Sequence, residues 1–207
     1  MPNGSFENPT TTFVNPTINN WTKTSQPFFF DPVAAGFSWD QTSGVFVNTA
    51  SGNANHIDNL DQNQAAFIIG IPTAGFFQDL SAVYTVGIPY TMNFGTISEA
   101  PAGDTLTLTA YYRDALNNIV PIATDTVTSL GNGVPNITTL QYSGLTIPTV
   151  SASDPWAGKT IGVLVSVGQG TGGDWDVDNV TVVPEPASAG LLVLGVGLLL
   201  QRRRRIA

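Results

Sequence analysis

Apolar and polar residues alternate along many short stretches of this chain. No stretch before residue 187 keeps the three-to-four-residue spacing of an amphipathic helix. The alternating stretches are rich in Val, Ile, Thr, Tyr and Phe, which are typical of strands. The pattern predicts strands at residues 5–7, 37–47, 64–71, 89–97, 105–113, 119–127, 139–147, 160–167 and 175–183. Segments rich in Gly, Pro, Asn and Asp predict turns at residues 100–104, 115–118, 130–133, 154–158 and 170–174.

Many short strands without helices indicate an all-β protein. Such patterns are typical of antiparallel β-sandwiches, and among these we expect a jelly roll. Residues 1–183 contain no internal repeat and no linker, and they are numerous enough to bury a sizeable core. We therefore expect one domain over residues 1–183, followed by a distinct segment over residues 184–207.

The charge of the chain is low in amount and uneven in position. Charged residues make up 11% of the sequence, against about 25% in ordinary globular domains. Residues 1–183 contain three basic and 14 acidic residues, so their formal charge is −11. Nucleic-acid binding requires basic residues that neutralise phosphates, and this composition excludes it. An acidic surface instead suits divalent cations or neutral polymers. The absence of cysteine excludes disulfides and thiolate metal sites.

The C-terminal segment has three parts: Pro184-Glu185-Pro186, an uncharged stretch over residues 187–200, and a basic cluster of Arg202, Arg203, Arg204 and Arg205. As a helix the uncharged stretch would be about 21 Å long, against about 30 Å for a bilayer core. Arginine side chains can reach the headgroups and the bilayer can thin, so we expect a single short transmembrane helix. The basic cluster would stay cytoplasmic, which places residues 1–183 outside. The alternative is a buried C-terminal core helix or a frayed tail.

This order of features resembles the PEP-CTERM sorting signal. The resemblance covers residues 184–207 and implies recognition by an exosortase and cleavage near Pro184-Glu185-Pro186. It also implies an exported protein of the cell envelope or extracellular matrix, held transiently in the membrane. Such proteins need an N-terminal export signal. Residues 1–13 have no basic start and no apolar core, so we expect the true start to lie upstream.

The two ends of the predicted domain resemble galactose-binding-like jelly rolls, which include carbohydrate-binding modules. The similar segments are PNGSFENP at residues 2–9, Trp21, and DWDVDNVTV at residues 174–182. Residues 65–97 resemble the middle of that family, where an aromatic-Gln turn follows an apolar strand. The resemblance implies one structural Ca²⁺ that joins the first and last strands, with Glu7 and Asp178 at the matching positions. The alternative is that both carboxylates are solvated or hydrogen-bonded at strand ends.

Aromatic doublets are the second candidate feature. Adjacent residues of a strand face opposite ways, so each doublet directs one ring away from the core or into a second apolar layer. An exposed ring surrounded by amides can stack on a sugar. The candidates for exopolysaccharide binding are Trp39, Phe77 and Tyr112, and the alternative is ordinary core packing.

Catalytic motifs are weak in this sequence. His56 is the one histidine, and it lies in a polar stretch with no Gly-x-Ser-x-Gly motif nearby. The glycine-rich residues 168–173 precede a predicted strand, not the helix that a dinucleotide site requires. We therefore expect a non-catalytic module that binds exopolysaccharide or has a structural role. The alternatives are a secreted hydrolase on the same scaffold and a protein-adhesive surface domain.

Overall fold

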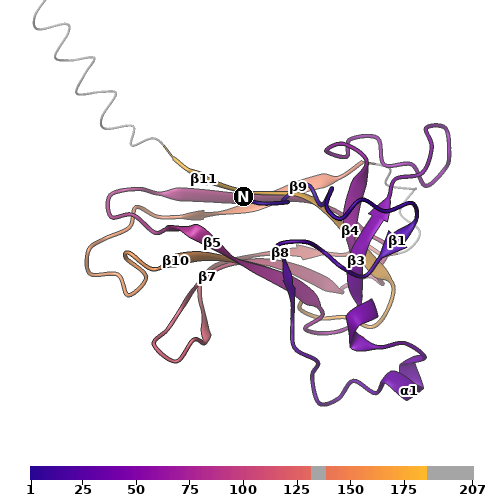
Figure 1. Cartoon of the computed structure of the whole chain (residues 1–207), viewed down its shortest axis with the longest axis horizontal. Coiled ribbons are helices and arrows are strands. Elements are labelled where there is room, and N and C mark those ends of the chain that lie inside the picture. The colour runs from indigo at the N-terminus through magenta and orange to yellow at the C-terminus, as the bar shows by residue number, and fades with distance from the viewer. Residues whose placement is uncertain (132–138, 186–207) are drawn as a thin grey trace, which may run out of the picture.

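The computed structural model describes residues 1–131 and 139–185 and shows two antiparallel sheets packed face to face (Figure 1). The first sheet has the strand order β1 (Val14–Asn15), β3 (Ser43–Val47), β4 (Gln64–Ile69), β11 (Asp174–Pro184), β6 (Tyr90–Ser98) and β9 (Gln141–Ile147). The second sheet has the order β2 (Thr22–Lys23), β5 (Gly75–Val83), β10 (Thr160–Val167), β7 (Thr105–Arg113) and β8 (Ile119–Thr128). The predicted all-β antiparallel sandwich is confirmed.

Alternation along each strand builds the core between the sheets. In β11, Trp175 and Val177 are fully buried in the core, whereas Asp174 and Asp176, which alternate with them, lie on the outer face of the first sheet. In β7, three alternate residues that point into the core are likewise apolar and fully buried: Leu106, Leu108 and Ala110. The period-two pattern of the sequence therefore determines which residues of β7 and of the first part of β11 face the core.

Residues 76–78 are not a turn, which corrects one expectation. They lie within β5, which pairs with β10 from Gly75 to Val83. Phe76 is fully buried in the core, and Phe77 faces the other side of the sheet. The aromatic doublet is thus an ordinary core-and-surface pair of a central strand.

Residues 5–7 are not a strand, which corrects a second expectation. The backbone turns at Phe6, where φ is 54°, and the Phe6 ring is fully buried against Trp21 and Phe76, with ring centroids 5.5 and 5.3 Å away. Hydrogen bonds from side chains hold this segment, where a strand would be held by backbone hydrogen bonds. The amide of Gln64 donates to the carbonyl oxygen of Phe6 over 3.0 Å, and that of Gln78 donates to the carbonyl oxygen of Asn20 over 2.7 Å.

Two short helical turns interrupt the connection between β2 and β3, where none was expected. They are α1 (Pro32–Ala35) and a 3₁₀ turn (Trp39–Gln41). The α1 turn lies far from the C-terminal end of β11, at the other end of the molecule (Figure 1).

The last strand continues into the Pro184-Glu185-Pro186 segment. Pro184 ends β11 and pairs with Tyr90 of β6. The backbone N–H of Glu185 donates to the carbonyl oxygen of Pro89 over 2.9 Å, and its carboxylate accepts from the hydroxyl of Thr91 over 2.6 Å. The predicted membrane helix, Pro186 and the arginine cluster all lie outside the described residues. Within the described part of the chain, no helix is long and apolar enough to cross a membrane.

Candidate functional site

A shallow hollow of about 400 Å³ lies on the outer face of the first sheet. Three neighbouring strands, β9, β6 and β11, provide its lining: Asn93, Tyr142, Ser143, Gly144, Asn179 and Thr181. We call this set the tyrosine hollow. Its lining contains amides, hydroxyls and one aromatic ring, and no charged side chain.

The pairing register of the three strands places the residues at the base of the hollow next to one another. Asn93 lies directly opposite Gly144 of β9 on one side and Thr181 of β11 on the other. Cross-strand neighbours share one face of a sheet, so these residues face outward while Met92 and Phe94 pack into the core. A Cβ atom at position 144 would lie 2.3 Å from Oδ1 of Asn93. Glycine at this position therefore leaves the amide of Asn93 uncovered.

A β-bulge places the second amide of the hollow. The register of β11 against β6 shifts between Asp178 and Thr181, and Asn179 within this shift has φ of 52°. Bulges re-aim side chains in this way. Nδ2 of Asn179 lies 3.4 Å from the hydroxyl oxygen of Tyr142, whose side chain is 54% exposed. The exposed ring thus has an amide beside its hydroxyl end.

This arrangement suits recognition of hydroxyl-rich, uncharged molecules. An exposed tyrosine ring offers an apolar face, and each asparagine amide offers both donors and an acceptor. Sugar rings combine apolar faces with hydroxyl groups, so the lining of the tyrosine hollow matches them in chemistry.

The three aromatic residues singled out in the sequence lie in different places. Trp39 is 6% exposed, its ring centroid lies 5.1 Å from that of Phe30, and its indole N–H donates to the carbonyl oxygen of Thr24. Tyr112 is half-buried and packs against the core. Phe77 is half-buried, and the guanidinium of Arg113 lies 5.2 Å from its ring centroid. The structure does not bring these three rings together.

The surroundings of Phe77 form a closed polar cluster. Arg113 forms an ion pair with Asp79 over 2.9 Å, and the hydroxyl of Tyr111 donates to the same carboxylate over 2.9 Å. Burial, followed by the hydrogen bond to Asp79, raises the pKa of Tyr111 well above its usual range. Because these groups bind one another, the cluster offers few open polar atoms to a ligand.

The N-terminal segment meets β11 where the backbone N–H of Val180 donates to the carbonyl oxygen of Gly4 over 2.9 Å, and the carboxylates of Glu7 and Asp178 lie near each other close to this contact. Oε1 of Glu7 accepts backbone hydrogen bonds from Asn63 and Gln64 over 2.8 and 2.7 Å. The carboxylate of Asp178 is fully buried and accepts backbone N–H groups of Asp61 and Asn179, each over 2.7 Å.

The charge of Asp178 is incompletely compensated. Burial raises the pKa of Asp178 to about 7, and the nearby carboxylates of Asp61 and Glu7 act in the same direction, whereas the two backbone hydrogen bonds act against it. Among the described residues, no group of three or more His, Cys, Asp or Glu side chains is placed to hold a metal ion.

His56 lies in the loop between β3 and β4. Its Nδ1 is 2.6 Å from the carbonyl oxygen of Thr49 in the same loop. The ring is therefore engaged by local backbone.

Comparison with known proteins identifies the fold. No family model and no curated protein matches the sequence. Among solved structures, a cyclase from Fischerella sp. TAU in complex with 4-(1H-indol-3-yl)butan-2-one is similar, with a TM-score of 0.63, 19% identity, and coverage of 90% of this chain and 96% of the cyclase. A second cyclase complex from Fischerella sp. TAU gives a TM-score of 0.64 at 18% identity, with the same coverage. The chain shares the fold of these cyclases.

Carbohydrate-binding modules also appear among the similar structures. The module TmCBM61 in complex with β-1,4-galactotriose has a TM-score of 0.49 and 14% identity, covering 89% of this chain and 97% of the module.

Proposed function

We propose that this protein is a non-catalytic module that binds a neutral extracellular polysaccharide in the tyrosine hollow. The observation that carries the proposal is the half-exposed ring of Tyr142 beside the amides of Asn93 and Asn179. This is the combination of a stacking surface and uncharged hydrogen-bonding groups that sugar binding uses.

The charge of the protein supports a neutral ligand. Residues 1–183 carry a formal charge of −11, which repels polymers rich in uronate or sulfate. The tyrosine hollow contains no cationic side chain that could offset this repulsion. A volume of about 400 Å³ on an open face suits one or two sugar residues of a longer chain that continues across the surface.

Replacing Tyr142 with alanine is expected to weaken polysaccharide binding at least about tenfold, because the stacking surface is lost. Binding of the full chain is measured by isothermal titration with neutral glycans selected on an array that includes uronate-containing polymers. The control is Phe13→Ala, which removes another exposed aromatic side chain, 78% exposed, from outside the hollow. If Y142A binds the glycan as well as the wild type does, the binding site does not include Tyr142. If the wild type prefers acidic glycans, the proposal of a neutral ligand is wrong.

We further propose one structural calcium ion at Glu7 and Asp178. Both carboxylates lie where the N-terminal segment meets β11, and the buried Asp178 has uncompensated charge that a divalent cation would offset. Each carboxylate oxygen has lone pairs beyond the backbone bonds that it accepts, so the pair can contribute ligands. The remaining oxygens would come from backbone carbonyls and water.

We propose that residues 184–207 direct an exported protein to an exosortase, with the C-terminus cytoplasmic until cleavage. Support comes from the order of Pro184-Glu185-Pro186, the apolar stretch and the arginine cluster. Mass spectrometry of the envelope and matrix fractions tests this. Loss of the arginine cluster from the mature protein is expected, and a cytoplasmic protein that retains Ala207 would overturn it.

A further inference from the structure

The connection between β3 and β4, residues 48–63, lies against the outer face of the first sheet. We call this connection the strap. Ile57 of the strap is 5% exposed, and it belongs to a small apolar cluster with Ile97 of β6 and Leu140, which comes directly before β9. This cluster is separate from the core between the sheets, because Ile97 and the core residue Met92 are on opposite faces of β6. The strap therefore reaches from β3 across the sheet to its edge strand β9.

Two asparagine side chains hold the strap in place. Nδ2 of Asn59 donates to the carbonyl oxygen of Leu140 over 3.2 Å, and its Oδ1 accepts the backbone N–H of Leu140 over 2.6 Å. Asn48 makes the same pair of bonds with the backbone of Ile57, over 2.9 and 3.0 Å. Each amide thus uses both a donor and its acceptor. The start of β9 is therefore tied to a residue that lies 81 positions earlier in the chain.

The side chain of Leu140 also lies beside Tyr142 of the tyrosine hollow. Tyr142 is opposite Gly95 in the pairing of β9 with β6. A Cβ atom at position 95 would lie 3.2 Å from Cε1 of Tyr142 and 3.2 Å from Cβ of Leu140, so both side chains lie over this glycine. Because the strap holds Leu140, it forms a wall at this end of the tyrosine hollow.

The opposite end of the tyrosine hollow continues onto exposed sheet. Thr91 lies two residues before Asn93 on the same face of β6, and it pairs with Thr146 of β9 and Val183 of β11. Thr146 is exposed, and Val183 is 48% exposed. In Figure 1 the strap lies at the right of the molecule, above β4, whereas β11 ends at the left. The hollow is therefore walled at the strap end and open toward the end of β11.

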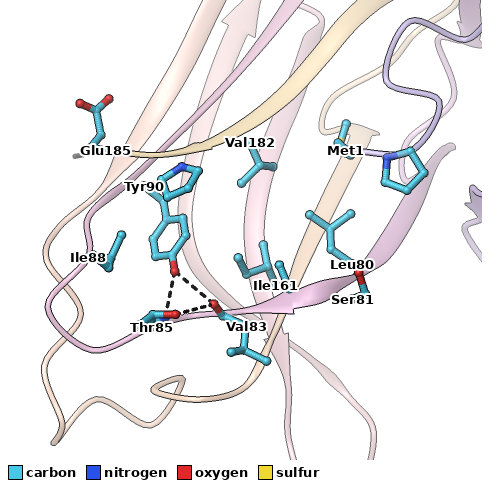
Figure 2. Close-up of a pocket in the computed structure, with 13 residues that line it drawn as sticks. Met1, Leu80, Ser81, Val83, Thr85, Ile88, Tyr90, Ile161, Val182 and Glu185 are labelled. Atoms are coloured by element: carbon cyan, nitrogen blue, oxygen red, sulfur yellow. Dashed lines mark hydrogen bonds between the residues drawn. The ribbon is translucent and has the colours of Figure 1, made fainter. Parts of the chain in front are cut away.

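A larger cleft near the end of β11 is a poor site for a sugar. Its volume is about 620 Å³, and it opens between the two sheets with mainly apolar walls: Met1, Leu80, Ile88, Tyr90, Ile161 and Val182 (Figure 2). The hydroxyl of Tyr90 is engaged, because it donates to the carbonyl oxygen of Val83 over 3.1 Å and accepts the backbone N–H of Thr85 over 2.9 Å (Figure 2). Sugar hydroxyls require open polar groups, so the tyrosine hollow suits a glycan better than this cleft does.

We propose that the tyrosine hollow binds the end of a glycan chain and excludes the interior of the chain. The terminal sugar lies on Tyr142 against the strap, and the following sugars continue over Asn93 toward Thr91. A sugar in the interior of a chain has a neighbour on each side, and one of these would overlap Leu140 and the strap. A wall that clashes with one ligand and not with another is a source of specificity. This inference rests on the proposed polysaccharide-binding function and names the part of the polymer that is recognised.

End recognition determines how binding depends on chain length. A linear chain has the same ends whatever its length. Once a chain is long enough to fill the hollow, its dissociation constant per chain therefore stays constant. Interior sites increase in number with length, so a protein that binds them binds long chains more tightly per chain.

Isothermal titration of the full chain tests the inference with xylan, mannan, galactan and β-glucan, each compared with linear oligosaccharides prepared from it. We expect equal dissociation constants per chain for a polymer that binds and for its oligosaccharides. If the polymer binds more tightly in proportion to its length, end recognition is wrong while the binding function stands. If none of these glycans binds, the proposed function fails and the inference fails with it.

Two variants remove the wall. Asn59→Ala frees Leu140 from the strap, and Leu140→Ala removes the side chain beside Tyr142. Both variants are expected to bind the polymer at least about tenfold more tightly per chain than the oligosaccharide, since steric exclusion by a few carbon atoms gives discrimination of this size. The matched control is Asn55→Ala, at an exposed position of the same strap, which should keep equal constants.

A general loss of stability cannot produce this change. Partial unfolding lowers the active fraction equally for both probes, so the ratio of the two dissociation constants reports on the wall alone. Tyr142→Ala tests the proposed function and should weaken binding of both probes together. Melting temperatures establish that each variant is folded. If both wall variants are folded and keep the wild-type ratio, the inference is overturned.

Discussion

Replacing Trp175 with alanine is expected to lower the free energy of unfolding by about 3–5 kcal/mol. The side chain is fully buried on β11, a central strand that pairs with β4 at Ile68 and with β6 at Ser98. Truncation to alanine removes a large ring from the middle of the core and leaves a cavity that its neighbours cannot fill. Chemical denaturation followed by circular dichroism measures the loss.

Phenylalanine at the same position should retain much of the stability. The indole Nε1 of Trp175 has no hydrogen-bond partner among the described residues, so phenylalanine keeps a large aromatic ring and removes an unpaired buried donor. The expected order of stability is wild type or W175F first and W175A last. A W175F protein as unstable as W175A would show that the indole N–H binds a partner.

Without divalent cations, the protein is expected to become less stable as the pH rises from about 4 toward 7. The pKa of Asp178 is about 7 in the folded protein and near the ordinary value of 3.8 in the unfolded chain. Between these values the folded state holds more protons, so unfolding becomes easier as pH rises. At about 1.4 kcal/mol for each pKa unit, this carboxyl contributes a decline of about 4 kcal/mol.

Two other carboxyls on the same strand act in the same direction. Burial raises the pKa of Asp176, and the nearby carboxylates of Asp174 and Glu99 raise it further. Burial also raises the pKa of Asp174, and the carboxylate of Glu99 raises it further. Their effect adds to that of Asp178, since all three favour the protonated folded state.

Denaturation at pH 4, 5.5, 7 and 8 in EGTA and in calcium checks this prediction. Calcium should restore stability at pH 8 and have little effect at pH 4, where protons compete for the carboxylates. Asp178→Asn should remove the calcium response, whereas the exposed-site control Asp40→Asn should keep it. If stability rises with pH in EGTA, the raised pKa of Asp178 is contradicted. If calcium still stabilises D178N, the proposed metal site is wrong.

The strands were predictable wherever alternation was the dominant signal. In β7, and in β11 before its bulge, the period-two pattern alone assigns the inner and outer residues, because burial on one face imposes that period. The resemblance to galactose-binding-like jelly rolls implied an aromatic-Gln turn at Phe76, where the structure instead has β5. The pattern failed at Phe6 because side chains such as Gln64 hold that segment through long-range hydrogen bonds that local sequence does not encode.

The tyrosine hollow was harder to find from the sequence. Leu145 and Ile147 mark the core face of β9, so Tyr142 has the opposite parity and must face outward. A single tyrosine is less conspicuous in the sequence than the aromatic doublets that contain Phe77 and Tyr112. The convergence of Asn93, Gly144 and Asn179 depends on strand pairing and a bulge, neither of which a single sequence reveals.

The position of β11 has a mechanical consequence. Its backbone is hydrogen-bonded to β4 over its first part and to β6 along most of its length, as far as Pro184. A force applied at Glu185 along the strand would load these bonds in shear, so that many must break together. A hairpin at the edge of a sheet would instead unzip one bond at a time. The chain therefore leaves the sandwich from a strand whose pairing resists a force applied at its C-terminal end.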